Sequence, residues 1–124
     1  MHEMSIAMSI VKIAEDEAKK AQVNHFAIID LEIGTLAGIA VEALDFVWEA
    51  AVQKTVLEKA EKRIKKIPAM ARCGDCEKVY SIDFIHDNCP DCSSFLKSII
   101  QGKELRVKSL ETFWTAQIFP IDRN

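Results

Sequence analysis

The first half of the chain alternates between two hydrophobic periods. Between residues 4 and 21, apolar residues recur at spacings of three and four, which is typical of one helix face. Residues 25–34 instead alternate apolar and polar side chains, which predicts a strand. Residues 41–52 return to the helical period and predict a second helix. The expected core positions of the two helices are Met4, Ala7, Met8, Val11, Ala14, Ala18 and Ala21, then Val41, Leu44, Val47, Trp48 and Ala51.

The second half holds a basic run and a long β-prone run. Residues 58–67 carry Lys59, Lys62, Arg63, Lys65 and Lys66. We interpret them as the solvated face of a strand that Pro68 ends, and a partner-docking or nucleic-acid patch is the alternative. The run from Leu105 to Phe119 is rich in β-branched and aromatic residues, and its length predicts a strand that returns to the first sheet.

The composition and charge indicate which classes of protein the chain can belong to. The chain has 124 residues, of which 49% are hydrophobic and 28% charged, which is typical of a globular domain. Its net charge of -3 argues against a strongly basic nucleic-acid footprint. No apolar stretch is long enough to span a bilayer. The N-terminal residues lack the basic region of a secretory signal. We therefore expect a cytoplasmic protein that starts at its first methionine.

All four cysteines lie in the centre of the chain, so we expect an insert between two parts of one larger unit. They form two Cys-x2-Cys pairs, Cys73 with Cys76 and Cys89 with Cys92, separated by twelve residues. Two such pairs on facing turns can supply four thiolates to one tetrahedral zinc ion. So short an insert cannot build a core alone, and metal binding would supply its folding energy. Four cysteine ligands leave no position for water, which excludes a hydrolytic centre.

The residues alone leave other interpretations of these cysteines open. Iron in a rubredoxin-like site and two redox-active dithiols are the alternatives, although two pairs at this spacing argue against a thioredoxin-like motif. His86, between the pairs, is expected to be an exposed loop residue, with a pH-sensitive or substitute-ligand role as the alternative. We assign no function to His25.

The N-terminus offers a second set of metal donors. A side chain as large as that of His2 is expected to prevent removal of Met1, which places a free α-amine one residue before an imidazole. The amine, the imidazole and backbone amide nitrogens, including that of Glu3, can form the planar nitrogen set that Ni(II) and Cu(II) favour. The alternative is an early histidine with no metal role, followed by an acidic residue that suits the first turn of a helix.

Together these motifs resemble the HypA family of nickel metallochaperones for [NiFe]-hydrogenase maturation, over about residues 1–115. The resemblance rests on Met1-His2-Glu3, Leu31-Glu32-Ile33-Gly34, Leu36-Ala37-Gly38, Glu42-Ala43-Leu44-Asp45-Phe46, the cysteine pairs and the segment from Gly102 to Glu111. Family members often carry glycine after the second cysteine of each pair, where this chain has Glu77 and Ser93.

The resemblance implies an α+β fold of two domains. A nickel domain, residues 1–68 and 103–124, would have a three-stranded sheet with two helices. An inserted zinc-ribbon-like domain, residues 69–102, would hold structural zinc through Cys73, Cys76, Cys89 and Cys92. Nickel, as cargo, would bind through His2, with backbone nitrogen from Met1 and Glu3. The implied partners are the GTPase HypB and the hydrogenase large subunit, and members occur as monomers or homodimers.

We therefore predict a metal carrier that is not an enzyme, because the sequence has no phosphate-binding loop and no pairing of nucleophile and base. Neither nucleic acid nor membrane is expected as a partner. The alternative function is a zinc-ribbon nucleic-acid-binding or adaptor module that uses the basic run and Trp114. Because linkers near Pro68 and Gly102 join the insert to the sheet, we also expect loss of zinc to alter partner docking.

Overall fold

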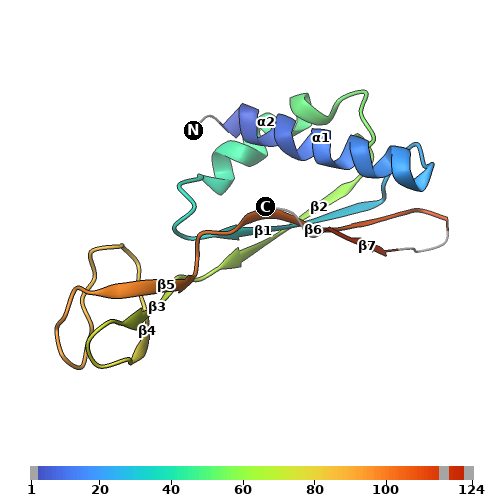
Figure 1. Cartoon of the computed structure of the whole chain (residues 1–124). Helices are drawn as coiled ribbons and strands as arrows, with labels where there is room; N and C mark the ends of the chain where they lie inside the picture. The colour runs from blue at the N-terminus through green and yellow to red at the C-terminus, as the bar shows by residue number, and fades with distance from the viewer. Residues whose placement is uncertain (1–2, 115–117, 122–124) are drawn as a thin grey trace.

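The structure is a computed structural model, and it describes residues 3–114 and 118–121. Its elements follow one another as two helices and seven strands, drawn in Figure 1. They are α1 (Glu3–Ala21), β1 (Ile28–Gly34), α2 (Val41–Val52), β2 (Glu61–Ile67), β3 (Met70–Cys73), β4 (Val79–Ser81), β5 (Lys97–Gln101), β6 (Leu105–Glu111) and β7 (Ile118–Pro120). No helix in the described part of the chain is long and apolar enough to cross a membrane.

The larger sheet has the strand order β2-β1-β6-β7, and both helices cover the same face of it (Figure 1). Strand β1 is parallel to β2 and antiparallel to β6, so the chain returns to this sheet after the cysteine insert. Two helices on a sheet of three long strands confirm the predicted fold class. The short strand β7 adds a fourth member at the edge, antiparallel to β6.

The predicted long strand from Leu105 to Phe119 is divided in two. Strand β6 ends at Glu111, and the chain turns back to pair β7 with the last residues of β6. The reason is the length of its partner: β1 has seven residues, and all of its pairing with β6 lies between Ile28 and Ile33. A strand that continued beyond its partner would leave its backbone groups unpaired.

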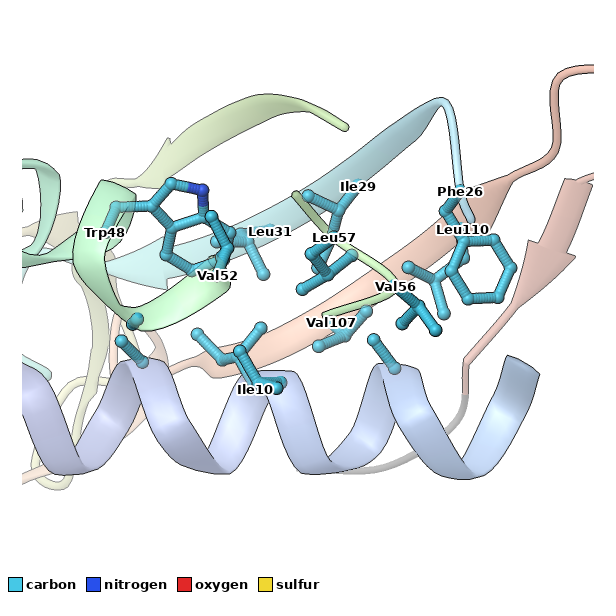
Figure 2. Close-up of a cluster of buried hydrophobic side chains, with 14 of the residues drawn as sticks. Ile10, Phe26, Ile29, Leu31, Trp48, Val52, Val56, Leu57, Val107 and Leu110 are labelled. Atoms are coloured by element: carbon cyan, nitrogen blue, oxygen red, sulfur yellow. The ribbon is translucent and has the colours of Figure 1, made fainter. Parts of the chain in front are cut away.

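The main core lies between the helices and the larger sheet. Figure 2 shows Ile10 of α1 and Trp48 of α2 pointing toward β1 and β6, where Leu31 and Val107 meet them. The prediction for α2 is confirmed, because Leu44, Trp48 and Ala51 are buried and Val41 and Val47 pack against the core.

The prediction for α1 is confirmed only in part. Ala7, Val11, Ala14 and Ala18 are buried, but Met4 and Met8 are 40% and 49% exposed, so their assignment to the core was wrong. The isoleucines of the same helix, Ile6 and Ile10, are buried instead. The buried stripe therefore lies on the isoleucine side of the alanines, and the methionine side of the helix is left toward solvent.

The cysteine insert forms a second, smaller sheet of order β4-β3-β5, which projects from one end of the larger sheet (Figure 1). It has its own small core of Ala69, Ala71, Cys73, Tyr80, Ile82 and Cys89. Six buried residues are few for an independently stable unit. The insert is therefore the part of the described chain that most needs another source of folding energy.

The two sheets meet at a tight junction around Gly34 and Gly102. A Cβ atom added to Gly34 would lie 2.0 Å from the Gly102 carbonyl oxygen, and Gly102 itself has a φ of +118°. The Thr35 hydroxyl accepts the backbone N–H of Ala69 at 3.1 Å, and Leu36 packs against the small core of the insert. The turn after β1 thus belongs by its contacts to both parts of the molecule.

Candidate metal centre

The two cysteine pairs lie on two turns with the same backbone hydrogen bonds. In the first turn, the N–H of Glu77 donates to the carbonyl of Cys73, and the N–H of Cys73 donates to the carbonyl of Lys78. The second turn repeats this pattern, with Ser93 and Ser94 in the places of Glu77 and Lys78. Backbone N–H groups also point at sulfur: Asp75 and Cys76 donate to Cys73 Sγ, and Asp91 donates to Cys89 Sγ, each at 3.4 Å. The two turns are therefore built as matching metal knuckles.

The four sulfur atoms lie at the separations that a tetrahedral ion requires. Cys73 Sγ lies 3.5 Å from Cys92 Sγ, and Cys76 Sγ lies 3.5 Å from Cys89 Sγ. All four ligand atoms lie within 4.8 Å of one another. Zn–S bonds of about 2.3 Å in tetrahedral geometry place the sulfurs about 3.8 Å apart. The donor set and its spacing therefore fit one zinc ion, and it is the only such cluster of metal-ligating side chains among residues 3–114 and 118–121.

The electrostatics of the cluster also favour a cation. The backbone N–H groups of Cys76 and Asp75 lower the pKa of the Cys73 thiol to about 6. The pKa of Cys92 is raised to about 12, although the N–H of Ser94 acts to lower it, because the thiols of Cys73, Cys76 and Cys89 surround it and it is desolvated. Four adjacent thiolates repel one another, so full deprotonation requires a bound positive charge.

Each knuckle holds one residue in the left-handed region of backbone conformation. Glu77 has a φ of 65° and Ser93 a φ of 62°. These are the two positions that follow the second cysteine of each pair. A side chain there costs about 1–2 kcal/mol relative to glycine. Both turns nevertheless keep the four cysteine sulfurs within 4.8 Å of one another.

Tyr80 of β4 packs against the cysteines from the small core. Its hydroxyl is buried without a hydrogen-bond partner among the described residues. Burial raises the pKa of Tyr80, and the nearby charges of Cys73, Cys89, Cys92 and Cys76 raise it further. The phenol is therefore neutral at physiological pH, and its ring is the largest side chain in the small core. Nothing in the sequence pattern marked Tyr80 as the largest side chain beside the cysteines.

The proposed nickel ligands lie at the start of α1. Glu3 is the first residue of the helix and is half-buried. Met1 and His2 lie outside the described residues, so their assignment as ligands stays a prediction. The first turn of α1 lies at the end of the larger sheet from which the insert projects (Figure 1). The cysteines and the N-terminal helix are therefore not one site, although they occupy the same end of the molecule.

The two other histidines and the basic run lie outside the cysteine cluster. His86 is exposed, as predicted, and its ring stacks on Phe84. His25 has a buried Nδ1 atom without a hydrogen-bond partner in the described structure. In the basic run, Lys62 forms an ion pair with Asp45 and lies over the ring of Trp48, while Arg63 pairs with Glu61. These pairings use part of the charge that a nucleic-acid patch would need.

The fold and the cysteine cluster define a small α+β metal-binding protein with a closed four-thiolate site. A family model described as "Hydrogenase/urease nickel incorporation, metallochaperone, hypA" matches residues 1–112. The chain belongs to the HypA family. The family's description is that of a metallochaperone for hydrogenase maturation, and not that of an enzyme.

Individual relatives agree with this assignment. The chain is 39% identical to the hydrogenase maturation factor HypA of Parabacteroides distasonis over 110 residues, which cover 89% of this chain and 96% of that protein. It is 40% identical to HypA of Geotalea uraniireducens over 111 residues, 90% of this chain and 98% of the relative. The solution structure of the Ni metallochaperone HypA from Helicobacter pylori matches with a TM-score of 0.66 at 27% identity, over 90% of this chain and 97% of that one.

Proposed function

We propose that this chain binds Ni(II) at its N-terminus and delivers it for maturation of [NiFe]-hydrogenase. The observation that carries the proposal is the closed geometry of the cysteine cluster in a member of a nickel-incorporation family. Four cysteine ligands fill the coordination sphere of a zinc ion and leave no position open for exchange. A cargo that must be released therefore needs a different site, and the N-terminal nitrogen donors provide one.

The nickel ligands of this proposal are His2, through its imidazole, and backbone nitrogen from Met1 and Glu3. Nitrogen donors in a plane suit Ni(II). These donors must lose protons to bind, so nickel affinity rises with pH and falls as the imidazole and amine become protonated. A partner can approach a metal site at a chain end and displace its ligands one at a time. A carrier requires such stepwise release of its metal.

Structural zinc is proposed for Cys73, Cys76, Cys89 and Cys92. Its role is to fold the insert, because the small core of that part holds only six buried residues. We accordingly assign residues 69–102 to a zinc domain, and residues 1–68 and 103–124 to the nickel domain. Separate hydrophobic cores and separate sheets support this division.

The proposed setting is the cytoplasm, with the GTPase HypB and the hydrogenase large subunit as partners. Hydrogenase maturation implies contact with other maturation proteins, and the chain's family is described by that process. A homodimer is part of the same proposal. Nucleotide hydrolysis is assigned to the GTPase partner, because this chain has no phosphate-binding loop.

The substitution His2→Ala tests the nickel site. It removes the imidazole, exposes Met1 to removal because alanine is small, and leaves the cysteine knuckles unchanged. We expect loss of specific nickel binding, by at least about 100-fold in affinity, with one zinc per chain retained. Isothermal titration with Ni(II) and metal analysis of the same sample measure both. His86→Ala is the matched control, because that histidine is exposed in the zinc domain and should not affect nickel. Equal nickel affinity in the His2→Ala variant would sink the assignment.

The adaptor alternative has one observation in its favour. Lys59 and Trp114 line the same open groove, of about 750 Å³, with His25 and Phe113. Trp114 is 96% exposed, which suits contact with a partner. Binding to DNA or RNA there would weaken steeply with salt. Filter binding at two salt concentrations separates this function from the carrier function.

A further inference from the structure

The cysteine cluster places an exposed sulfur opposite a buried one in two positions. Cys76 and Cys92, the second cysteine of each pair, are exposed, whereas Cys73 and Cys89 are each 1% exposed. Cys92 Sγ lies 3.5 Å from Cys73 Sγ, and Cys76 Sγ lies 3.5 Å from Cys89 Sγ. Each exposed sulfur therefore faces a buried sulfur that belongs to the opposite knuckle.

Solvent reaches this cluster at sulfur, although four cysteine ligands leave no open position on the metal. A zinc-bound cysteine is a thiolate, and the thiolate is the form that reacts with small oxidants. Susceptibility follows thiolate character and exposure, so Cys76 and Cys92 are the positions that a peroxide can reach. Cys73 and Cys89 are shielded from the oxidant but lie next to the sulfurs that it reaches.

The oxidation balances in two steps with hydrogen peroxide as the oxidant. An exposed thiolate attacks one peroxide oxygen, so that an S–O bond forms, the O–O bond breaks and hydroxide leaves; the sulfur is then a sulfenic acid. The facing buried thiolate attacks that sulfur, an S–S bond forms and a second hydroxide leaves. Two thiolates have lost two electrons, and one peroxide has gained them. When both sulfur pairs react, the metal is released, because a disulfide sulfur lacks the negative charge that binds zinc.

The insert depends on these sulfurs for its fold. Its small core has six buried residues, and Cys73 and Cys89 are two of them. Beyond the knuckles, the Lys97 ammonium donates to the carbonyl oxygens of Ile85 and Phe95 at 2.8 and 2.9 Å. Two hydrogen bonds at the surface cannot replace a metal ion that binds four sulfurs. Loss of the metal would therefore unfold the insert, whereas the main core contains none of the cysteines.

We propose that the cysteine cluster is a reversible oxidation site, at which hydrogen peroxide forms the disulfides Cys73–Cys92 and Cys76–Cys89, releases zinc and unfolds the insert. The proposal goes beyond nickel delivery and rests only on the zinc assignment of the proposed function. A dithiol reductant reverses the oxidation, because it stops at the disulfide. Partner contacts made through the insert are then lost on oxidation and regained on reduction.

The connectivity distinguishes this site from a pair of redox-active dithiols. In that alternative each Cys-x2-Cys pair would form its own disulfide. Here both disulfides join the two knuckles, because each exposed sulfur reacts with the buried sulfur that faces it. The expected connectivity therefore follows from the geometry of this cluster and not from the presence of zinc-bound thiolates alone.

Two proteases determine the connectivity. Trypsin cleaves after Lys78 and so separates the knuckles into fragments 73–78 and 79–97. Disulfides across the cluster keep these two fragments linked, and disulfides within each pair leave them separate. A protease that cleaves before aspartate, at Asp75 and Asp91, separates the two cysteines of each pair and shows which sulfur is joined to which.

The test is treatment of the reduced, zinc-loaded full chain with hydrogen peroxide. We expect bound zinc, measured with a chromophoric chelator, to fall from one per chain to none. Free thiols, counted after denaturation, should fall from four to none. Peptide mapping should show Cys73 joined to Cys92 and Cys76 joined to Cys89. Dithiothreitol with Zn(II) should restore the original zinc content and thiol count.

Met4 and Met8 require a matched control, because they are 40% and 49% exposed and peroxide also oxidises methionine. The double variant Met4→Leu with Met8→Leu removes both thioethers and should release zinc at the wild-type rate. Slower release from this variant would assign the effect to α1 instead of the cysteines and would overturn the proposal.

The remaining outcomes separate the proposal from the assignment on which it rests. Three results would each overturn the proposal and leave the proposed function unchanged: zinc and all four thiols retained in peroxide, disulfides within each pair, or sulfinic acid that dithiothreitol does not reduce. A reduced chain that binds no zinc would contradict the zinc assignment itself, and the proposal with it.

Discussion

At the scale of single residues, each knuckle contains one residue with a strained backbone conformation, which the sequence already indicated. Glu77 and Ser93 stand where the resemblance leads one to expect glycine, and both have a positive φ. The left-handed conformation follows from the geometry of the knuckle, because the turn must bring both cysteines of a pair to one ion. The backbone strain is local to each of these two positions, and glycine should relieve it at the position that is substituted.

Glycine at these positions should stabilise the zinc-loaded protein. We expect Glu77→Gly and Ser93→Gly each to raise the free energy of unfolding by about 0.5–1 kcal/mol, because glycine removes the steric cost at positive φ but loses more conformational entropy on folding. Chemical denaturation of the zinc-loaded protein measures the change. Asp75→Gly is the control: Asp75 lies in the first knuckle but is not among the residues with positive φ, so glycine there should stabilise nothing. A loss of stability at both positions would contradict the account.

Residue by residue, the sequence predicted the clustering of the four cysteines better than the contacts that support it. The spacing of the cysteines was enough to predict one four-sulfur cluster, because two Cys-x2-Cys turns have few ways to face each other. The double hydrogen bond of Lys97 had no signal, since nothing local marks a lysine that donates to two backbone carbonyls. The exposure of Met4 and Met8 was missed because helical period alone does not decide which flank of a broad apolar stripe meets the sheet.

At the scale of elements, the turn after β1 decides how the two sheets are joined. Its backbone passes so close to that of Gly102 that no side chain fits at Gly34. The N–H of Leu36 donates to the carbonyl of Gly102 at 2.7 Å, and the N–H of Gly34 donates to that of Glu104 at the same distance. Periodicity predicted the elements on either side of this turn, whereas the close approach depends on pairing between distant segments.

A methyl group at Gly34 should therefore disturb the junction. We expect Gly34→Ala to lower the free energy of unfolding by about 2–3 kcal/mol, because the clash is with backbone that cannot rotate away. Gly38→Ala is the matched control: it has a positive φ of 77° but nothing within 4 Å of an added Cβ. Its cost is backbone strain alone, of about 1 kcal/mol. Thermal unfolding of the two variants side by side measures the difference, and equal melting temperatures would refute the argument.

At the scale of the whole molecule, the two hydrophobic cores differ in size. The main core has nineteen buried residues from both helices, the larger sheet and the loops beside them, against six in the insert. We expect zinc to be needed for the insert and dispensable for the helices. Under the proposed function the two metals have different tasks: zinc folds the insert, and nickel is carried as cargo.

Removal of zinc by a chelator should therefore unfold only one part. Tyr80 is the only tyrosine of the chain and lies in the small core, so it reports on the insert alone. We expect the aromatic nuclear magnetic resonance signals of Tyr80 to lose their native chemical shifts on chelation and to regain them with zinc, while the helical circular dichroism in the far ultraviolet is kept. Loss of both signals together would show that the two cores unfold as one unit.

The central claim is that the N-terminal residues hold nickel. The most direct measurement is a Ni(II) titration of protein with its native N-terminus, followed by the visible ligand-field bands, beside a control protein with three extra residues before Met1. We expect one nickel per chain in the native protein and its loss in the control, because the three added residues move the α-amine out of chelating reach of His2 while the zinc knuckles stay intact. Binding that is equal in the two proteins, or absent from the native one, would contradict it.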